Sequence, residues 1–369
     1  MPRNLVICCD GTSNQPADDM TNVAKLYFTL ENDPARQITF YHPGLGTMAP
    51  PGALTPTEKF TTVTLGLALG AGIESDIRDA YVFLADYFTP GDRVFLFGFS
   101  RGAYTVRALA GLLRMYGLIE PGNAPLAPYA IEMIFAINRA QGRNDDNTAR
   151  QVFELAARFR STYSRECQPY FVGVWDTVSS VGWFAHPTSL PYTANNPDVA
   201  ISRHAVSIDE HRAFFPSNLW RPSPAPPSGP KDLKQVWFPG SHCDVGGGYP
   251  EGPQSAQSKY PLRWLLSEAA AAGLLTNQAR VDDILGISPG SHYQQASVQF
   301  PLHNSLTGWW TLAEFIPKPY YDYATGKRTW RANLFRRRVI PPGSLVHASA
   351  YMRGEAYCRR LPPDARRVD

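Results

Sequence analysis

Two kinds of hydrophobic pattern alternate along this chain. Short, uniformly apolar runs indicate buried strands, and they occur at 4–9, 37–42, 93–97, 169–175, 233–238 and 345–348. Longer stretches with apolar residues every three or four positions indicate helices, at 73–88, 102–115, 128–141, 147–163 and 262–272, with a short one near 209–214. Because strands alternate with helices and each strand is apolar throughout, the pattern predicts an α/β fold with a mainly parallel sheet covered on both faces.

The segment 95–104 carries the strongest chemical signal. It places Gly98-x-Ser100-x-Gly102 between a predicted strand and a predicted helix, which is the setting of a nucleophile elbow. The sharp turn strains the serine backbone, so the residues two positions away on each side must be small. We therefore interpret Ser100 as a catalytic nucleophile. The alternative is a Gly-Ser turn in a non-catalytic α/β protein.

A serine nucleophile needs a histidine base and an acid that orients the base, and in elbow proteins the order is serine, acid, histidine. Two acids follow Ser100 at predicted strand ends. Asp176 comes directly after the strand 169–175, and Asp244 lies in the glycine-rich loop after the strand 233–238. We favour Asp176 as the acid. Asp244 is the alternative acid, or a supporting residue that bonds the backbone amides of its own loop.

Three histidines are candidates for the base. His242 follows the strand 233–238 and stands before three consecutive glycines, which are costly to order unless a special backbone path is needed. His347 lies in an apolar run, where a histidine is more often a core group, and His204 lies among charges that can pair with one another at a helix entry. We favour His242 and keep His347 and His204 as alternatives.

The oxyanion hole needs two backbone N–H donors. Arg101 follows the nucleophile directly and supplies the first. The second comes from a loop after an early strand, and Gly11 or Thr12 is the best candidate, since glycine lets the backbone approach a substrate closely. Asp10 either supports this site or caps its own turn.

Composition and motifs exclude several other functions. The net charge of +3 gives no nucleic-acid footprint. The late basic clusters 336–338, 359–360 and 366–367 are interpreted as solvated surface, with attraction to anionic lipid or to a protein partner as the alternative. Five cysteines without a CxxC pair argue against a disulfide framework or a zinc site. Dinucleotide-binding, P-loop, H-E-x-x-H and EF-hand patterns do not occur, so we expect no cofactor and no metal requirement. A signal-peptide pattern and an apolar run long enough to span a bilayer are also not found.

Five motifs in order resemble the DUF2235 α/β-hydrolase family, whose best-known members are lipase effectors of the bacterial type VI secretion system. The motifs are Asp10-Gly11-Thr12, Gly98-Phe-Ser-Arg-Gly102-Ala103, Gly173-Val-Trp-Asp176-Thr177-Val178, His204-Ala-Val-Ser-Ile-Asp209-Glu210-x-Arg212 and Trp237-Phe-Pro-Gly-Ser-His242-x-Asp244-Val-Gly-Gly-Gly-Tyr249. The resemblance implies a serine hydrolase that cleaves carboxylic esters through an acyl-enzyme, as a lipase or phospholipase. It also implies a triad of Ser100, Asp176 and His242.

This resemblance sets the remaining expectations. We predict one α/β-hydrolase domain over 1–369, with insertions at about 186–232 and 250–330 forming loops or a cap over the active site. Expected partners are an ester or phospholipid substrate, a membrane surface in peripheral contact, and a secretion-system or immunity protein, but no nucleic acid. The protein is expected in the cytoplasm, or exported without a cleaved signal peptide. A small-ester carboxylesterase and a catalytically silent binding module are the alternatives, and the aromatic region around Trp309 is either a lipid-facing rim or core packing.

Overall fold

The computed structural model describes residues 2–11, 20–44, 72–142, 145–178, 190–222, 229–306, 308–321 and 328–369. These residues form a parallel eight-stranded sheet in the order β12-β11-β8-β7-β6-β3-β1-β2. Its strands are β1 (Asn4–Cys9), β2 (Gln37–His42), β3 (Arg93–Phe99), β6 (Pro169–Trp175), β7 (Ile201–Ser207), β8 (Asp232–Phe238), β11 (Leu345–His347) and β12 (Arg366–Val368). Two antiparallel pairs join β4 (Leu118–Ile119) to β5 (Ser164–Arg165) and β9 (Lys318–Tyr321) to β10 (Arg328–Arg331).

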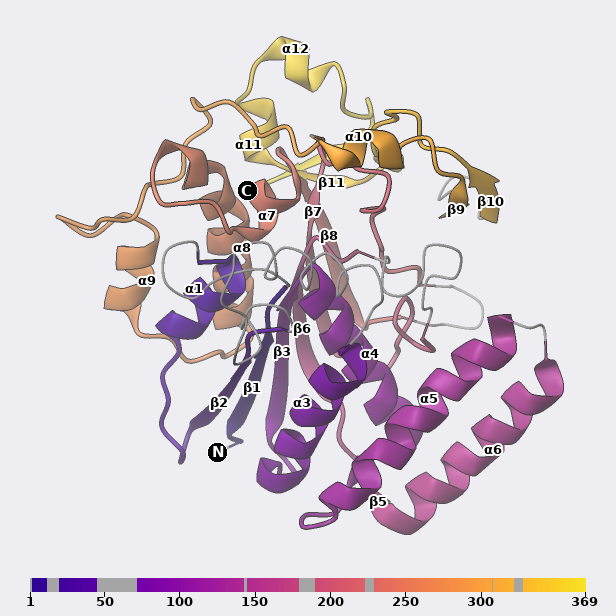
Figure 1. The fold of residues 1–369 in the computed structure, drawn as a ribbon. Helices are drawn as coiled ribbons and strands as arrows, with labels where there is room; N and C mark the ends of the chain where they lie inside the picture. The colour runs from indigo at the N-terminus through magenta and orange to yellow at the C-terminus, as the bar shows by residue number, and fades with distance from the viewer. Residues whose placement is uncertain are drawn as a thin grey trace, which may run out of the picture.

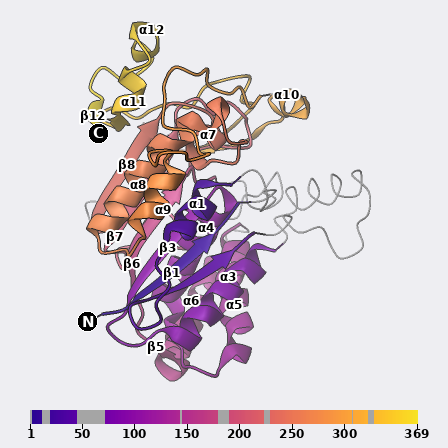
Figure 2. The same ribbon diagram turned by 90° about the vertical axis from the view of Figure 1, so that its left-hand side faces the viewer.

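Helices cover both faces of the sheet (Figures 1 and 2). Alternate residues of β1 point to opposite faces, as the pleat of a strand requires, so Leu5 and Ile7 join one core and Val6 and Cys8 the other. The first core lies under α3 (Ile73–Tyr87), α4 (Arg101–Tyr116), α5 (Ala127–Gly142) and α6 (Asp146–Tyr163). The second lies under α1 (Asn22–Thr29), α8 (Lys259–Ala271) and α9 (Gln278–Ile284).

Four short helices lie near the carboxyl ends of the strands, at the top of Figure 1: α7 (His242–Gly246), α10 (Trp309–Ala313), α11 (Ala348–Tyr351) and α12 (Glu355–Cys358). The predicted α/β fold, with its mainly parallel sheet between helices, is thus confirmed. Every strand predicted from an apolar run is present in the sheet.

The prediction was wrong for two segments. The stretch 209–214 forms no helix, and the helix entry expected at His204 is instead the central strand β7. The strand was not recognised because its sequence carries a charged residue, Arg203, which suggested an exposed segment. In the structure Arg203 is buried and forms ion pairs with Asp232 and Glu268. The helix α1 was also missed.

The two predicted insertions are partly core. The interval 186–232 contains β7, and the interval 250–330 contains α8, which packs against β6 and β7. That the rest of these intervals covers the active site stays a prediction, as does the single-domain organisation.

The environment of His347 predicts a structural role for its side chain. Its ring stacks on Phe238 at 4.6 Å, and its Nδ1 accepts a hydrogen bond from the Ser349 amide at the start of α11. We expect His347→Ala to lower the free energy of unfolding by about 1–3 kcal/mol, measured by urea denaturation, and to keep ester hydrolysis. His347→Asn can still cap the helix and should lose less. An inactive but stable His347→Ala would contradict this role.

Two buried histidines make the fold sensitive to acid. Burial lowers the pKa of His204 to about 3 and that of His347 to about 4, whereas both titrate near about 6.5 in an unfolded chain. Between these values the unfolded state binds more protons, so stability falls as the pH drops below about 6.5. Urea midpoints at pH 7.5, 6.0 and 5.0 should decrease in that order, and less steeply for His347→Asn. Equal midpoints across this range would refute the prediction.

Candidate active site

Ser100 occupies a sharp turn between β3 and α4. Its backbone has φ 57° and ψ −118°, a strained conformation for a residue with a side chain. A Cβ on Gly98 would lie 2.5 Å from the carbonyl oxygen of Gly102, and a Cβ on Gly102 would lie 2.1 Å from the carbonyl oxygen of Cys9. Both positions therefore require glycine, because the strand, the turn and the neighbouring β1 touch through their backbones.

Asp176 follows β6 directly and is fully buried. Its carboxylate accepts hydrogen bonds from the Ser207 amide at 3.0 Å and from the Nδ1 of His242 at 2.5 Å, and it forms an ion pair with Arg338. Burial alone would raise the pKa of Asp176, but Arg338 and His242 hold it well below its ordinary value. The group is therefore a carboxylate at neutral pH.

His242 begins α7 and lies between two aromatic rings. The centroid of its ring is 4.6 Å from that of Phe99 and 5.0 Å from that of Phe215. Burial lowers the pKa of His242, and the bond to Asp176 opposes this effect only in part. Since the carboxylate of Asp176 can only accept, Nδ1 is the donor and Nε2 keeps a free lone pair. The ring thus has the tautomer of a general base.

Ser100 and His242 belong to neighbouring parts of this site, since Phe99 directly precedes the serine and packs against the imidazole. Among the residues that the structure describes, no hydrogen bond joins the serine hydroxyl to the ring. Catalytic hydrogen bonds are often long without substrate and shorten when it binds. Of the three residues that the sequence analysis favoured, the structure joins Asp176 to His242 and places Ser100 directly after a ring that packs on His242.

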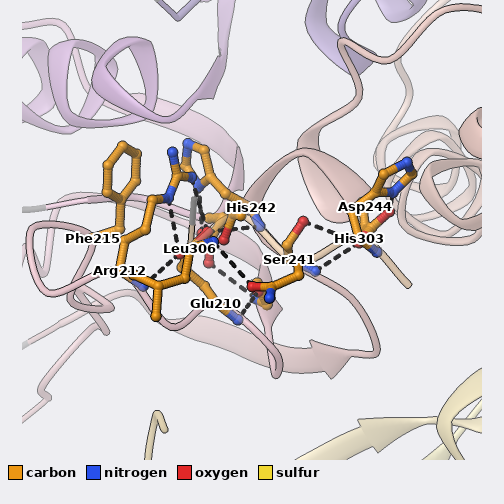
Figure 3. Close-up of polar contacts among 12 residues, drawn as sticks. Glu210, Arg212, Phe215, Ser241, His242, Asp244, His303 and Leu306 are labelled. Carbon is orange, nitrogen blue, oxygen red and sulfur yellow. Dashed lines mark hydrogen bonds and ion pairs between the residues drawn. The ribbon is translucent and has the colours of Figure 1, made fainter. Parts of the chain in front are cut away.

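The loop after β7 supports the histidine (Figure 3). Glu210 accepts hydrogen bonds from the backbone N–H of His242, from the side chain of Arg212 and from the hydroxyl of Ser305. The Arg212 guanidinium in turn lies 3.6 Å from the ring centroid of Phe215. The charges of this motif were expected to pair, but the stacking of Arg212 on Phe215 and the bond from Glu210 to the His242 amide could not be deduced from it.

Asp244 has a different role from Asp176. It accepts hydrogen bonds from the amide of Ser241, which caps α7, and from the backbone and ring of His303 (Figure 3). This agrees with the alternative that Asp244 bonds the amides of its own loop. The structure pairs His242 with Asp176 instead.

The other two histidines lie apart from this pair. His204 is fully buried in β7, where its Nε2 accepts a hydrogen bond from the Thr177 amide at 3.3 Å. His347 lies against Phe238 at the end of β11. Both are core groups with local partners.

The candidate oxyanion donors are only partly described. A Cβ on Gly11 would lie 3.3 Å from the Cβ of Ser100, so this glycine borders the nucleophile. Its N–H, however, donates to Asp10, which also accepts from the hydroxyl groups of Thr21 and Tyr41. Asp10 therefore ties the end of β1 to Thr21 and Tyr41. Thr12 lies outside the described residues, and Arg101 begins α4.

Arg338 was missed by the sequence analysis, which assigned the cluster 336–338 to the solvated surface. Arg336 and Arg337 are exposed as expected. The side chain of Arg338 is only 7% exposed and bonds Asp176. A local sequence pattern cannot show this contact, because the two residues are 162 positions apart.

No three His, Cys, Asp or Glu side chains among the described residues are placed to hold one metal ion. No helix in the same part of the chain is long and apolar enough to cross a membrane.

Comparisons with known proteins place this site in a family. Residues 3–268 match the model described as type VI secretion system, phospholipase effector Tle1-like, catalytic domain. The uncharacterized protein YEL023C of Saccharomyces cerevisiae is 34% identical over 230 residues, which are 60% of this chain and 33% of that protein. The chain thus spans about a third of this relative.

Two solved structures are also similar. An uncharacterized protein from Pseudomonas aeruginosa shares 20% identity with a TM-score of 0.44, over 75% of this chain and 46% of that one. The Tle1 effector bound to the VgrG spike shares 18% identity with a TM-score of 0.36, over 68% and 52% of the two chains. The family match covers more than half of the chain and confirms the predicted resemblance: this chain belongs to the family of Tle1-like phospholipase effectors of the type VI secretion system, and it matches their catalytic domain.

Proposed function

We propose that this protein is a serine hydrolase that cleaves carboxylic esters of phospholipids through an acyl-enzyme. Ser100 attacks the ester carbonyl, and His242 takes its proton through Nε2 and later returns it to the leaving alcohol. Asp176 orients the ring and stabilises its cation. Water then attacks the acyl-enzyme while His242 accepts its proton, and His242 passes this proton to the Ser100 oxygen as the acyl–serine bond breaks and the fatty acid leaves. No cofactor takes part.

One observation carries this proposal. A buried aspartate, at the carboxyl end of the strand next to β3, holds Nδ1 of a histidine at 2.5 Å, and that ring packs on the residue preceding a strained serine. The carboxyl ends of parallel strands are where α/β proteins assemble their sites. The order of serine, acid and histidine along the chain agrees with that of elbow hydrolases.

The proposal places the oxyanion near the start of α4. The Arg101 N–H follows the nucleophile and belongs to the positive end of the helix dipole, which stabilises a developing negative charge. For the second donor, the proposal keeps Gly11 or Thr12. In the case of Gly11, a substrate oxygen would have to compete with the Asp10 carboxylate for the N–H.

An exposed apolar surface near the site supports a lipid substrate. We define this docking surface by large hydrophobic side chains of one segment that are each at least 45% exposed: Leu312, Phe315, Ile316, Trp330, Leu334, Phe335 and Val339. The rings of Phe315 and Phe335 touch, with centroids 5.7 Å apart. Trp310 of the same segment contacts Phe215, whose ring lies against His242.

The charges around the docking surface favour an anionic bilayer. Arg336 and Arg337 are exposed beside it, whereas the acid Glu314 is fully buried and bonded to Asn333 and Ala213. Exposed arginines next to apolar side chains are suited to anionic lipid headgroups. We therefore propose peripheral contact with an anionic membrane as the route to the substrate.

The family also bears on partners and location. Its members are described as type VI secretion effectors, so we propose a secretion-system partner and export. A small-ester carboxylesterase would prefer short p-nitrophenyl esters to phospholipid vesicles. A catalytically silent module would not react with a fluorophosphonate probe.

The first test concerns the triad. Ser100→Ala and His242→Ala should each lower kcat by about 10⁴- to 10⁶-fold, and the double variant should be no worse, because triad members act as a unit. Asp176→Asn should lose roughly 10⁴-fold. The assay is hydrolysis of p-nitrophenyl esters and of phospholipid vesicles, with products identified by mass spectrometry.

The matched control for this test is Ser161→Ala, which removes an exposed hydroxyl on α6. It should keep wild-type activity and the fluorophosphonate label that Ser100→Ala loses. A folded Ser100→Ala variant with substantial activity would overturn the serine mechanism.

The second test concerns the docking surface. The double variant Trp330→Ser/Phe335→Ser should bind vesicles of phosphatidylglycerol and phosphatidylcholine roughly tenfold more weakly, since it removes two large apolar side chains from the interface. Its hydrolysis of a soluble short-chain ester should not change. Vesicle binding is measured by co-sedimentation.

The control is Tyr129→Ser on α5, a side chain that is 66% exposed on another part of the molecule (Figure 1). It should bind vesicles as the wild type does. If the double variant and this control bind vesicles equally, the docking surface does not bind lipid, and a protein partner becomes the alternative occupant.

A further inference from the structure

A buried arginine from the C-terminal part of the chain reaches the proposed catalytic acid. Arg338 lies in the segment that carries the docking surface, between Phe335 and Val339, and beyond residues 3–268, which match the family. Its side chain is 7% exposed, and the carboxylate of Asp176 is fully buried. The contact therefore forms away from water, where charge–charge interactions are strong.

The guanidinium of Arg338 is bound at four points. Nη1 donates to Oδ1 of Asp176 at 2.5 Å and to the carbonyl of Ser207 at 3.0 Å. Nη2 donates to Oδ2 of Asp176 at 3.1 Å and to the carbonyl of Phe215 at 2.6 Å. The planar fork thus fixes the plane of the carboxylate, which also bonds His242 through Oδ2. A lysine has a single nitrogen and cannot reproduce this fork.

Two buried carboxylates at the site each have a guanidinium partner, and Arg338 supplies one of the two. The carboxylates of Asp176 and Glu210 face the guanidinium groups of Arg338 and Arg212. A proton on His242 would add a fifth charge to this buried group. Asp176 also interacts with the neutral His204 and with the Cys243 thiol, on which the carboxylate of Asp244 acts as well.

We propose that Arg338 is a positioning residue, which keeps Asp176 ionised and aligned with His242 and thereby sets the lower pH limit of catalysis. It acts through Asp176 and does not touch the substrate. This inference rests on the proposed serine mechanism. It adds Arg338 to the three proposed triad residues. Asp176 depends on this arginine, which comes from a segment outside the family match.

The sign of the effect follows from the charge balance. Without Arg338, Asp176 and Glu210 carry one more charge than Arg212 compensates, so the Asp176–His242 pair takes up a proton more readily. A protonated His242 cannot accept the proton of Ser100. The acid limb of the pH profile therefore moves to higher pH.

The experiment compares pH profiles of kcat/KM for a short p-nitrophenyl ester. Arg338→Met should shift the acid limb upward by about one pH unit and lower the plateau of kcat/KM at least tenfold, mainly through kcat. Arg338→Lys keeps the positive charge but not the planar fork. The acid limb of its pH profile should therefore stay near that of the wild type, while its plateau of kcat/KM falls. Arg359→Met, just after α12 where the side chain is 79% exposed, removes one arginine charge away from the site and should match the wild type.

Two further measurements separate the possible failures. In an Asp176→Asn background, Arg338→Met should cause no additional shift, because the effect passes through the carboxylate. Circular dichroism shows whether Arg338→Met folds. If it does not, Arg338→Lys becomes the test, and a kcat/KM plateau equal to that of the wild type in this variant overturns the proposal. An unshifted profile in a folded Met variant overturns it as well. Failure of the serine mechanism itself would show differently, as activity retained by Ser100→Ala.

Discussion

The site depends on how one buried carboxylate is compensated. Removing a charged carboxylate from water costs several kcal/mol unless hydrogen bonds and an opposite charge replace its hydration. Asp176 finds these partners 31, 66 and 162 positions further along the chain, at Ser207, His242 and Arg338. The sheet, α7 and the C-terminal segment must therefore all be in place before the charge is stable. Formation of the site is thus tied to completion of the fold.

The strained serine turn makes a second demand on the same region. A non-glycine residue with positive φ costs about 1–3 kcal/mol, and the surrounding contacts must hold it. Here the Ser100 amide donates to the carbonyl of Trp175, and Gly102 lies against the end of β1. The turn is thus fixed by both strands that flank β3, β1 and β6. One of these, β6, also presents Asp176, so the proposed nucleophile and the proposed acid share a rigid support.

The C-terminal segment connects this support to the surface. Its Arg338 reaches inward to Asp176, Trp310 contacts the ring that lies on His242, and Phe315 and Phe335 face outward. A single stretch of chain thus forms the apolar, basic docking surface and completes the charge balance of the site. With the proposed phospholipid substrate, this arrangement places the proposed catalytic residues close to the proposed lipid contact.

The sequence alone determined the features that depend on short-range order. Uniformly apolar runs gave the buried strands, the Gly98–Gly102 spacing gave the turn, and the residues after two strands gave Asp176 and His242 as partners, because carboxyl ends of parallel strands meet at one edge. Only the tertiary structure decided which charges are buried. Arg203 made β7 resemble a helix entry, and Arg338 resembled surface like its two neighbours. A charge becomes a core group only through partners brought to it by folding, and those partners lie too far along the chain for a local pattern to reveal them.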